Sequence, residues 1–179
     1  MQAAGYNWEI DALDRIAIRD HQRNIESTVL LLPTSTGGFW SSSDVILTTP
    51  LRNYTVDDYP DLFDDISYPD GRQKLEAIET EEYNFTDGEL GVAIYCFYSN
   101  GVPTPQRLIY DSMSTFPDGE PVLEMGDGDG TVNVRSLEAC RRWRDVQRHH
   151  QVNVKHYSGI GHRELLHHPA LIDDVLRIA

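Results

Sequence analysis

The pattern of apolar and polar residues changes at about residue 91. The run GVAIYCFYS (91–99) is apolar almost throughout, as a buried strand is. Two further short strands, RLIYD (107–111) and VLEM (122–125), are predicted after it. The runs NGVPTPQ (100–106) and TFPDGEP (115–121) contain Pro and Gly and are predicted to be turns. This half of the chain therefore begins as a series of strands.

Helices alternate with strands in the rest of the chain. A helix is predicted over RSLEACRRWRDVQRHH (135–150), a strand over VNVKHY (152–157) and a second helix over RELLHHPALIDDVLRI (163–178). The stretch MGDGDGTVNV (125–134) precedes the first helix, and SGIGH (158–162) precedes the second. This alternation favours an α/β domain. Both loops then follow the carboxyl ends of strands, where open α/β sheets hold their active sites.

The first ninety residues carry weaker periodicity. Thr55 stands before Asp57 and Asp58, which is typical of a helix N-terminus, because a capping hydroxyl and acidic residues suit the helix dipole there. The elements expected in this part are a partly helical segment (9–26), a short apolar stretch ended by Pro33 (27–33), a strand (45–50) and two helices (55–66 and 72–83).

The chain has 179 residues, enough for one domain with a sizeable core, and a formal net charge of −14. Such an acidic protein is not expected to bind nucleic acid, whose partners are basic, or to adhere to anionic lipid at neutral pH. Protonation of all seven histidines in an acid compartment would halve the charge to −7. No apolar run approaches about 18 residues, so no transmembrane segment is expected.

Residues 1–20 have neither a basic start nor a continuous apolar segment, so no signal peptide is expected in this chain. Two features nevertheless suggest a secreted or lysosomal protein whose N-terminal part is missing. The chain has only two cysteines, Cys96 and Cys140, and it has glycosylation sequons at Asn53 and Asn84. The cysteines are predicted to form a disulfide that closes a loop of about 45 residues and adds roughly 4 kcal/mol to stability. The alternative is two buried free thiols.

The loop DGDGTVNVRSLE (127–138) allows several interpretations. Numbered as a calcium-binding loop, it has oxygen-bearing side chains at positions 1, 3, 7 and 12, which are Asp127, Asp129, Asn133 and Glu138. Its sixth position, however, is Val132 instead of the glycine that the sharp turn needs. A phosphate-binding loop would have more glycines and usually a lysine. No metal or cofactor is therefore predicted. The loop is either a plain turn or carries the acid of a catalytic triad.

The next loop favours the triad. SGIGHREL (158–165) places His162 at a glycine-flanked exit from a strand, one αβ unit after the aspartates. Ser…Asp…His is the chain order of α/β-hydrolases, in which the aspartate orients the histidine and the histidine takes the proton of the serine. Alone, His162 would be interpreted as an exposed loop histidine. His162, His167 and His168 lack the i, i+4 spacing of a zinc-binding helix, so His167 and His168 are predicted to be ordinary helix positions. His149 and His150 are predicted to belong to the basic, solvated end of the 135–150 helix, which suits the helix dipole.

Several motifs resemble the lecithin:cholesterol acyltransferase family, in the same order along the chain. They are IRDHQRN, LLLP, NYTVDDYPDLFDDISYPDG, YCFYSNGVPTP, GDGDGTVNVRSLEAC and the histidine loop. GVPTP and GDGDGTVN are the most specific of them. The resemblance is greatest to the lysosomal (group XV) phospholipase A2 branch and runs from about residue 15 to the end.

The resemblance implies the C-terminal part of an α/β-hydrolase fold, with an incomplete sheet and the nucleophile half missing. Asp129 matches the triad aspartate, since it directly precedes Gly-Thr-Val, and His162 matches the triad histidine. The implied regions are a lid-like or irregular segment (1–26), a cap-like region with short helices and strands (27–90) and a hydrolase core with both loops (91–179).

By the same resemblance, Cys96 and Cys140 match a family disulfide and Asn53 a glycosylated asparagine, whereas Asn84 has no counterpart. The implied activity is that of a phospholipase A2 and O-acyltransferase, in which an acyl-enzyme passes its acyl group to water or to a lipid alcohol. The implied substrates are glycerophospholipids and lipid alcohols at a membrane or lipoprotein surface. No cofactor is implied, and the implied location is lysosomal or secreted.

The nucleophile of the family lies upstream, in an Ala-His-Ser-Met-Gly elbow. These 179 residues contain no Gly-X-Ser-X-Gly motif, and Ser158 lacks the preceding glycine. An aspartate and a histidine without a serine cannot form an acyl-enzyme. The chain alone is therefore predicted to be inactive. The alternative function is that of a non-catalytic truncated paralogue or a binding or regulatory α/β chain.

Overall fold

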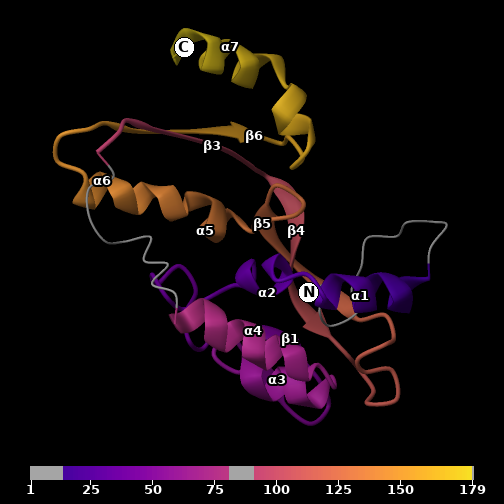
Figure 1. Ribbon diagram of the computed structural model, residues 1–179. Helices are drawn as coiled ribbons and strands as arrows, with labels where there is room; N and C mark the ends of the chain where they lie inside the picture. Colours follow the sequence, from indigo (N-terminus) through magenta and orange to yellow (C-terminus); the bar gives the residue numbers. More distant parts are fainter. Residues whose placement is uncertain (1–13, 81–90, 179) are drawn as a thin grey trace. The chain divides into compact units, whose positions relative to one another are not determined.

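The computed structural model describes residues 14–80 and 91–178 as a mixed α/β structure with a partial sheet (Figure 1), consistent with an α/β-hydrolase-like fold. The chain divides into two compact units. Unit 1 is Met1–Tyr83 with Arg107–Glu124, and unit 2 is Asn84–Gln106 with Met125–Ala179. Within the described ranges no helix is both long and apolar enough to cross a membrane. The division into lid-like, cap-like and core regions stays a prediction.

Unit 1 combines helices with short strands. Its elements include α1 (Arg15–Arg23), α2 (Ser27–Leu30), β1 (Val45–Thr48), β2 (Asn53–Thr55), α3 (Tyr59–Asp65) and α4 (Pro69–Thr80). β1 and β2 belong to a four-stranded sheet with the order β2-β1-β4-β5. Its other two strands are β4 (Val102–Ile109) and β5 (Val122–Gly128). The core of unit 1 is aliphatic and aromatic, and Leu47, Phe63 and Leu108 are each 1% exposed.

The helix predicted from Thr55 begins later, at Tyr59. Thr55 is the last residue of β2, and the N-cap of α3 is Asp58, so the predicted N-cap was wrong. The Asp58 carboxylate accepts hydrogen bonds from the backbone N–H (2.7 Å) and the hydroxyl (2.6 Å) of Thr55, which folds the chain into a turn between β2 and α3. Pro60 stands in the first turn of α3, where a missing N–H leaves no hydrogen bond unmade.

Two parallel strands form the centre of unit 2. β3 (Ile94–Asn100) pairs with β6 (Val152–Ser158) along their whole length. Helical segments cover both faces of this pair (Figure 1). They are α5 (Val134–Leu137), η2 (Glu138–Arg142) and α6 (Trp143–Val146) on one face and η3 (Glu164–His167) and α7 (Pro169–Ile178) on the other. Strand side chains alternate between the faces: Cys96 is bonded to Cys140 of η2, and the Tyr157 hydroxyl donates to Asp174 of α7 (2.6 Å).

The run 100–106, predicted to be a turn, is mostly strand. Only the turn around Gly101, which has φ +80°, remains, and β4 begins at Val102. Pro103 and Pro105 remove no donor from the ladder between β1 and β4, because β1 pairs only with Leu108 and Ile109 of β4.

The two helices predicted at the end of the chain are both interrupted. The helix expected over 135–150 consists of three short segments that end at Val146, so His149 and His150 lie beyond it instead of within its basic end. The final helix is divided because Pro169 lacks a backbone N–H and disfavours helical geometry in the residue before it. It therefore opens α7 instead of continuing η3.

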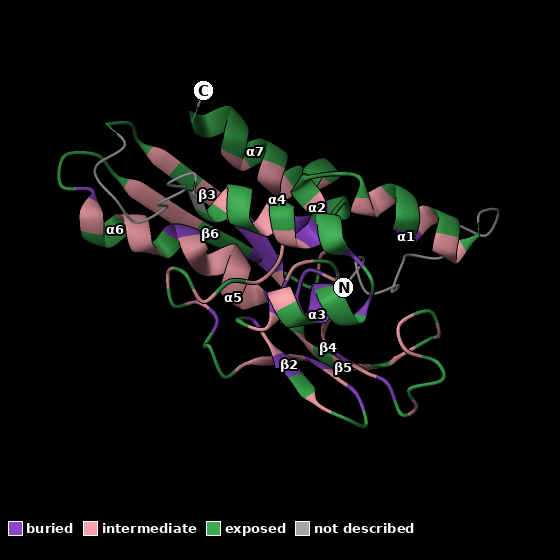
Figure 2. Ribbon diagram, turned by 60° about the horizontal axis from the view of Figure 1, so that its bottom comes forward, coloured by how far each residue is buried: buried purple, intermediate pink, exposed green. Residues whose placement is uncertain are grey.

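Burial increases along β3 toward its carboxyl end. Tyr95 is 44% exposed, whereas Tyr98 is 3% and Ser99 is 0% exposed. By contrast, α7 has no buried residue and is drawn entirely in green and pink in Figure 2. The buried end of β3 leads to the turn that contacts the aspartate and histidine loops.

Candidate active site

Asp129 directly follows β5, which runs further than predicted and ends at Gly128. The residue is 4% exposed, and its Oδ1 accepts hydrogen bonds from the backbone N–H groups of Thr131 (2.9 Å) and Val132 (2.7 Å). The loop curls around the carboxylate because Gly130 has φ +90°, a conformation that residues with a side chain rarely adopt. The two donors stabilise the buried charge and fix the direction of the other oxygen, Oδ2.

His162 lies in the loop after β6, within hydrogen-bond distance of that oxygen. Its Nδ1 is 2.7 Å from Oδ2 of Asp129. The backbone N–H of His162 also donates to the carbonyl oxygen of Asp129 (2.8 Å), so two hydrogen bonds join the same two residues. The side chain of Asp129 is 4% exposed and that of His162 is 47% exposed. The carboxylate of the pair is therefore buried, whereas the imidazole is partly exposed to solvent.

This geometry sets the roles of the two imidazole nitrogens. When Nδ1–H points at a carboxylate, Nε2 carries the lone pair and can accept a proton. The buried carboxylate can then stabilise the imidazolium that forms. An aspartate–histidine pair of this kind can act as the base and its orienting acid once a hydroxyl lies beside Nε2.

The other aspartate of the loop has a different partner. Asp127 is exposed, and its Oδ1 accepts the backbone N–H of Gly101 (2.7 Å). Glu138, the twelfth residue in the calcium-loop numbering, accepts a hydrogen bond from the Tyr98 hydroxyl (2.6 Å). In the part of the chain that the structure describes, no three His, Cys, Asp or Glu side chains are grouped to hold a metal ion.

The disulfide expected from the sequence is present. It joins Cys96 of β3 to Cys140 of η2, with a sequence separation of 44. Beside it, the Tyr98 hydroxyl donates to Glu138 and accepts a hydrogen bond from Arg141 (2.8 Å). Burial and the Glu138 hydrogen bond raise the pKa of Tyr98. These contacts fasten the helical segment that follows the aspartate loop to β3.

The remaining predicted sites lie elsewhere. Asn53 is exposed on β2, and Asn84 lies outside the described residues, so glycosylation of both stays a prediction.

His168 accepts the backbone N–H of Ala170 at its Nδ1 (3.3 Å), which makes it a capping residue at the start of α7.

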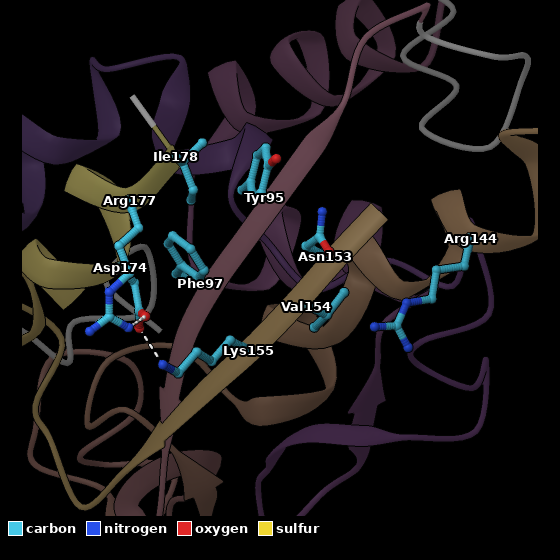
Figure 3. A pocket seen from close by; sticks show the side chains of 9 residues that line it. All are labelled: Tyr95, Phe97, Arg144, Asn153, Val154, Lys155, Asp174, Arg177 and Ile178. Carbon is cyan, nitrogen blue, oxygen red and sulfur yellow. Dashed lines mark hydrogen bonds and ion pairs between the residues drawn. The ribbon is translucent and has the colours of Figure 1, made fainter. Parts of the chain in front are cut away.

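An open pocket of about 440 Å³ lies in unit 2 (Figure 3). Phe97 of β3 and Asp174 of α7 line it, and Lys155 of β6 forms an ion pair with Asp174. Neither Asp129 nor His162 is among its lining residues. The pocket is therefore separate from the aspartate–histidine pair.

Comparison with known proteins places the chain in a family. The family model described as lecithin:cholesterol acyltransferase matches residues 86–169, a range that includes both loops. The lysosomal phospholipase A and acyltransferase of Canis lupus familiaris and that of Homo sapiens are each 40% identical over 164 residues. The chain belongs to the lecithin:cholesterol acyltransferase family. The phosphatidylcholine-sterol acyltransferase of Gallus gallus is 36% identical over 165 residues.

The family relatives are much longer than this chain. Each of these three alignments covers 92% of the chain but only 38% of the relative. What the complete proteins do is therefore carried over to this chain only as a proposal.

The residues that hold the two loops were not predicted from the sequence. Ser99 and Thr104 are both 0% exposed and bond to the backbone of the loops, and Asp127 bonds to the turn between β3 and β4. The one available signal was the GVPTP motif, which includes Thr104 but had no role in the predicted chemistry.

Proposed function

We propose that this chain is the C-terminal part of a lipid O-acyltransferase or phospholipase A2 with a Ser-Asp-His triad. In it, Asp129 orients His162, and the serine comes from outside these 179 residues. The 2.7 Å contact between Nδ1 of His162 and Oδ2 of Asp129 carries the proposal, because a triad histidine requires this contact. The names of the relatives, phospholipase A and acyltransferase, support the reaction class.

The reaction would proceed through an acyl-enzyme. Nε2 of His162 takes the proton of the serine hydroxyl while the serine oxygen attacks the ester carbonyl carbon, and Asp129 stabilises the imidazolium. The imidazolium then gives this proton to the departing lysophospholipid oxygen as the ester C–O bond breaks. In the second half, Nε2 removes a proton from water or a lipid alcohol as its oxygen attacks the acyl-enzyme carbonyl carbon. The imidazolium then returns this proton to the serine oxygen as the bond between the acyl carbon and the serine breaks, which releases a fatty acid or a new ester.

The substrates would be glycerophospholipids and lipid alcohols at a membrane or lipoprotein surface, and no cofactor would be needed. Relatives named lysosomal phospholipase A and acyltransferase and phosphatidylcholine-sterol acyltransferase support lipid esters as acyl donors. The first name also supports a lysosomal location, with secretion as the other route. The half-exposed imidazole of His162 leaves room for a serine and a substrate on its open side.

The test is to assay phospholipid hydrolysis and acyl transfer by the 179-residue chain and by a longer product of the same gene that includes a serine elbow. We expect no activity from the chain alone, because two triad members without a nucleophile cannot form an acyl-enzyme. In the longer product, Asp129→Asn should lower kcat by about 10⁴-fold. Asp173→Asn, at an exposed position of α7, is the matched control and should leave kcat unchanged.

Three outcomes would contradict the proposal. Hydrolysis by the 179-residue chain that is lost on Ser158→Ala would place the nucleophile inside the chain. Equal kcat values for the Asp129→Asn and Asp173→Asn enzymes would remove Asp129 from the triad. If the gene encodes no serine elbow, the non-catalytic alternative replaces the proposal.

A further inference from the structure

Two hydroxyl side chains at the turn between β3 and β4 are fully buried. Ser99 and Thr104 are both 0% exposed, and buried hydroxyls in proteins are normally hydrogen-bonded. Each bonds to the backbone of a different loop: Thr104 to the loop of Asp129 and Ser99 to the loop of His162. The GVPTP motif (101–105), which includes Thr104, has no part in the chemistry proposed above.

Thr104 contacts the residues on both sides of Asp129. Its Oγ1 accepts the backbone N–H of Gly130 (2.8 Å) and donates to the carbonyl oxygen of Val102 (2.9 Å). A Cβ atom on Gly128 would lie 2.5 Å from this Oγ1, so only glycine lets the two segments approach this closely. Since Gly128 and Gly130 flank Asp129, Thr104 fixes the backbone from which the carboxylate projects.

Ser99 and its neighbour hold the histidine loop in a similar way. The hydroxyl of Ser99 donates to the carbonyl oxygen of Ile160 (2.6 Å), and the carbonyl oxygen of Asn100 accepts the backbone N–H of Gly159 (2.7 Å). Both loop residues lie shortly before His162. Gly159 has φ +73°, and a glycine has more backbone conformations available than other residues, so these contacts restrict a loop that would otherwise vary.

We propose that Ser99 and Thr104 are positioning residues for the Asp129–His162 pair, a role whose catalytic meaning rests on the proposed function. One short segment, residues 99–104, is bonded to both loops and so sets the distance between their backbones. Catalytic groups must be held within about 0.5 Å of their working geometry. The two hydroxyls act through backbone groups of the loops, and losing either one removes one of the hydrogen bonds that hold a loop in place.

The test compares Thr104→Ser with Thr104→Ala in the 179-residue chain, because both lose the methyl group and only the second loses the hydroxyl. The readouts are the low-field proton NMR signal of the His162 Nδ1–H and amide-hydrogen exchange at Gly130. We expect Thr104→Ala to lose the low-field signal and to exchange Gly130 about tenfold faster. Thr104→Ser should retain the wild-type values. Thr115→Ala, which removes a hydroxyl-to-carbonyl hydrogen bond in unit 1, is the matched control and should change neither.

Near-ultraviolet circular dichroism shows whether each variant folds. If Thr104→Ala does not fold, Ser99→Ala replaces it and should lose the His162 signal. A folded Thr104→Ala or Ser99→Ala chain with the wild-type signal would overturn the positioning role and leave the proposed function intact. A wild-type chain without the signal, or a signal that persists in Asp129→Asn, would show that the pair does not form and would overturn both.

Discussion

The two oxygens of the Asp129 carboxylate have separate partners. Oδ1 accepts the N–H groups of Thr131 and Val132, and Oδ2 faces Nδ1 of His162. Asp127 has no comparable surroundings, since it is exposed and bonded to the turn after β3. The Gly-Asp-Gly-Asp pattern alone offers both aspartates as candidates, so the choice of Asp129 depended on the family motif.

Asp174 of α7 provides a pH-dependent contribution to stability. Its pKa is lowered because it accepts hydrogen bonds from Lys155 and Tyr157 of β6. Since the folded-state pKa lies below the unfolded value, this stabilisation is present at neutral pH and is lost as the pH falls through the folded-state pKa. Asp174→Asn should therefore lower the melting temperature at pH 7 and lower it progressively less toward about pH 3.

Thermal unfolding of the wild type and the Asp174→Asn chain across this pH range is the measurement. Asp173→Asn, at the neighbouring exposed position, is the matched control and should show no such trend. A difference between wild type and Asp174→Asn that stays constant with pH would contradict the ionic interpretation of this contact.

Among the elements, the strands with continuous apolar runs were the most predictable. The strands expected at 91–99 and 152–157 are confirmed as β3 and β6, because an apolar run of that length between turn signals has few other solutions. The run 100–106 was missed because its Pro and Gly residues locally favour a turn, whereas pairing with distant strands decides the outcome. The break at Pro169 was missed because the apolar spacing continues across it.

The candidate pair and its supports differ in how far sequence can predict them. The aspartate loop and His162 could be selected because each follows a strand and their order matches a known chemistry, and the family motif then selected Asp129 within its loop. Ser99 and Thr104 could not, because their hydroxyls bond to backbone atoms of other segments. Every residue has such backbone atoms, so no residue type marks these contacts in advance.

The disulfide links β3 to η2 and should contribute to the stability of the chain. Replacing both Cys96 and Cys140 with serine removes a crosslink between residues separated by 44 positions. The expected loss in the free energy of unfolding is about 4 kcal/mol, since the crosslink restricts the unfolded chain. Urea denaturation measures it, and the reduced wild type should match the double variant. Coincident unfolding curves for the oxidised wild type and the double variant would contradict this expectation.

At the scale of the whole molecule, the fold joins two residues that are 33 positions apart in sequence. Asp129 follows β5 and His162 follows β6, and both belong to unit 2. The pair is therefore formed within one compact unit, although the chain spans only 38% of the length of the relatives compared above. Under the proposed function, the hydroxyl that faces Nε2 of His162 comes from outside these 179 residues.

The most direct test of this claim is the low-field proton NMR spectrum of the 179-residue chain and of its Asp129→Asn and Asp127→Asn variants. We predict a hydrogen-bonded Nδ1–H signal of His162 in the wild type and its loss in Asp129→Asn. Asp127→Asn should keep the signal, because its amide oxygen can still accept the backbone N–H of Gly101. The same signal in all three chains, or its absence from the wild type, would contradict the pairing on which the proposed triad depends.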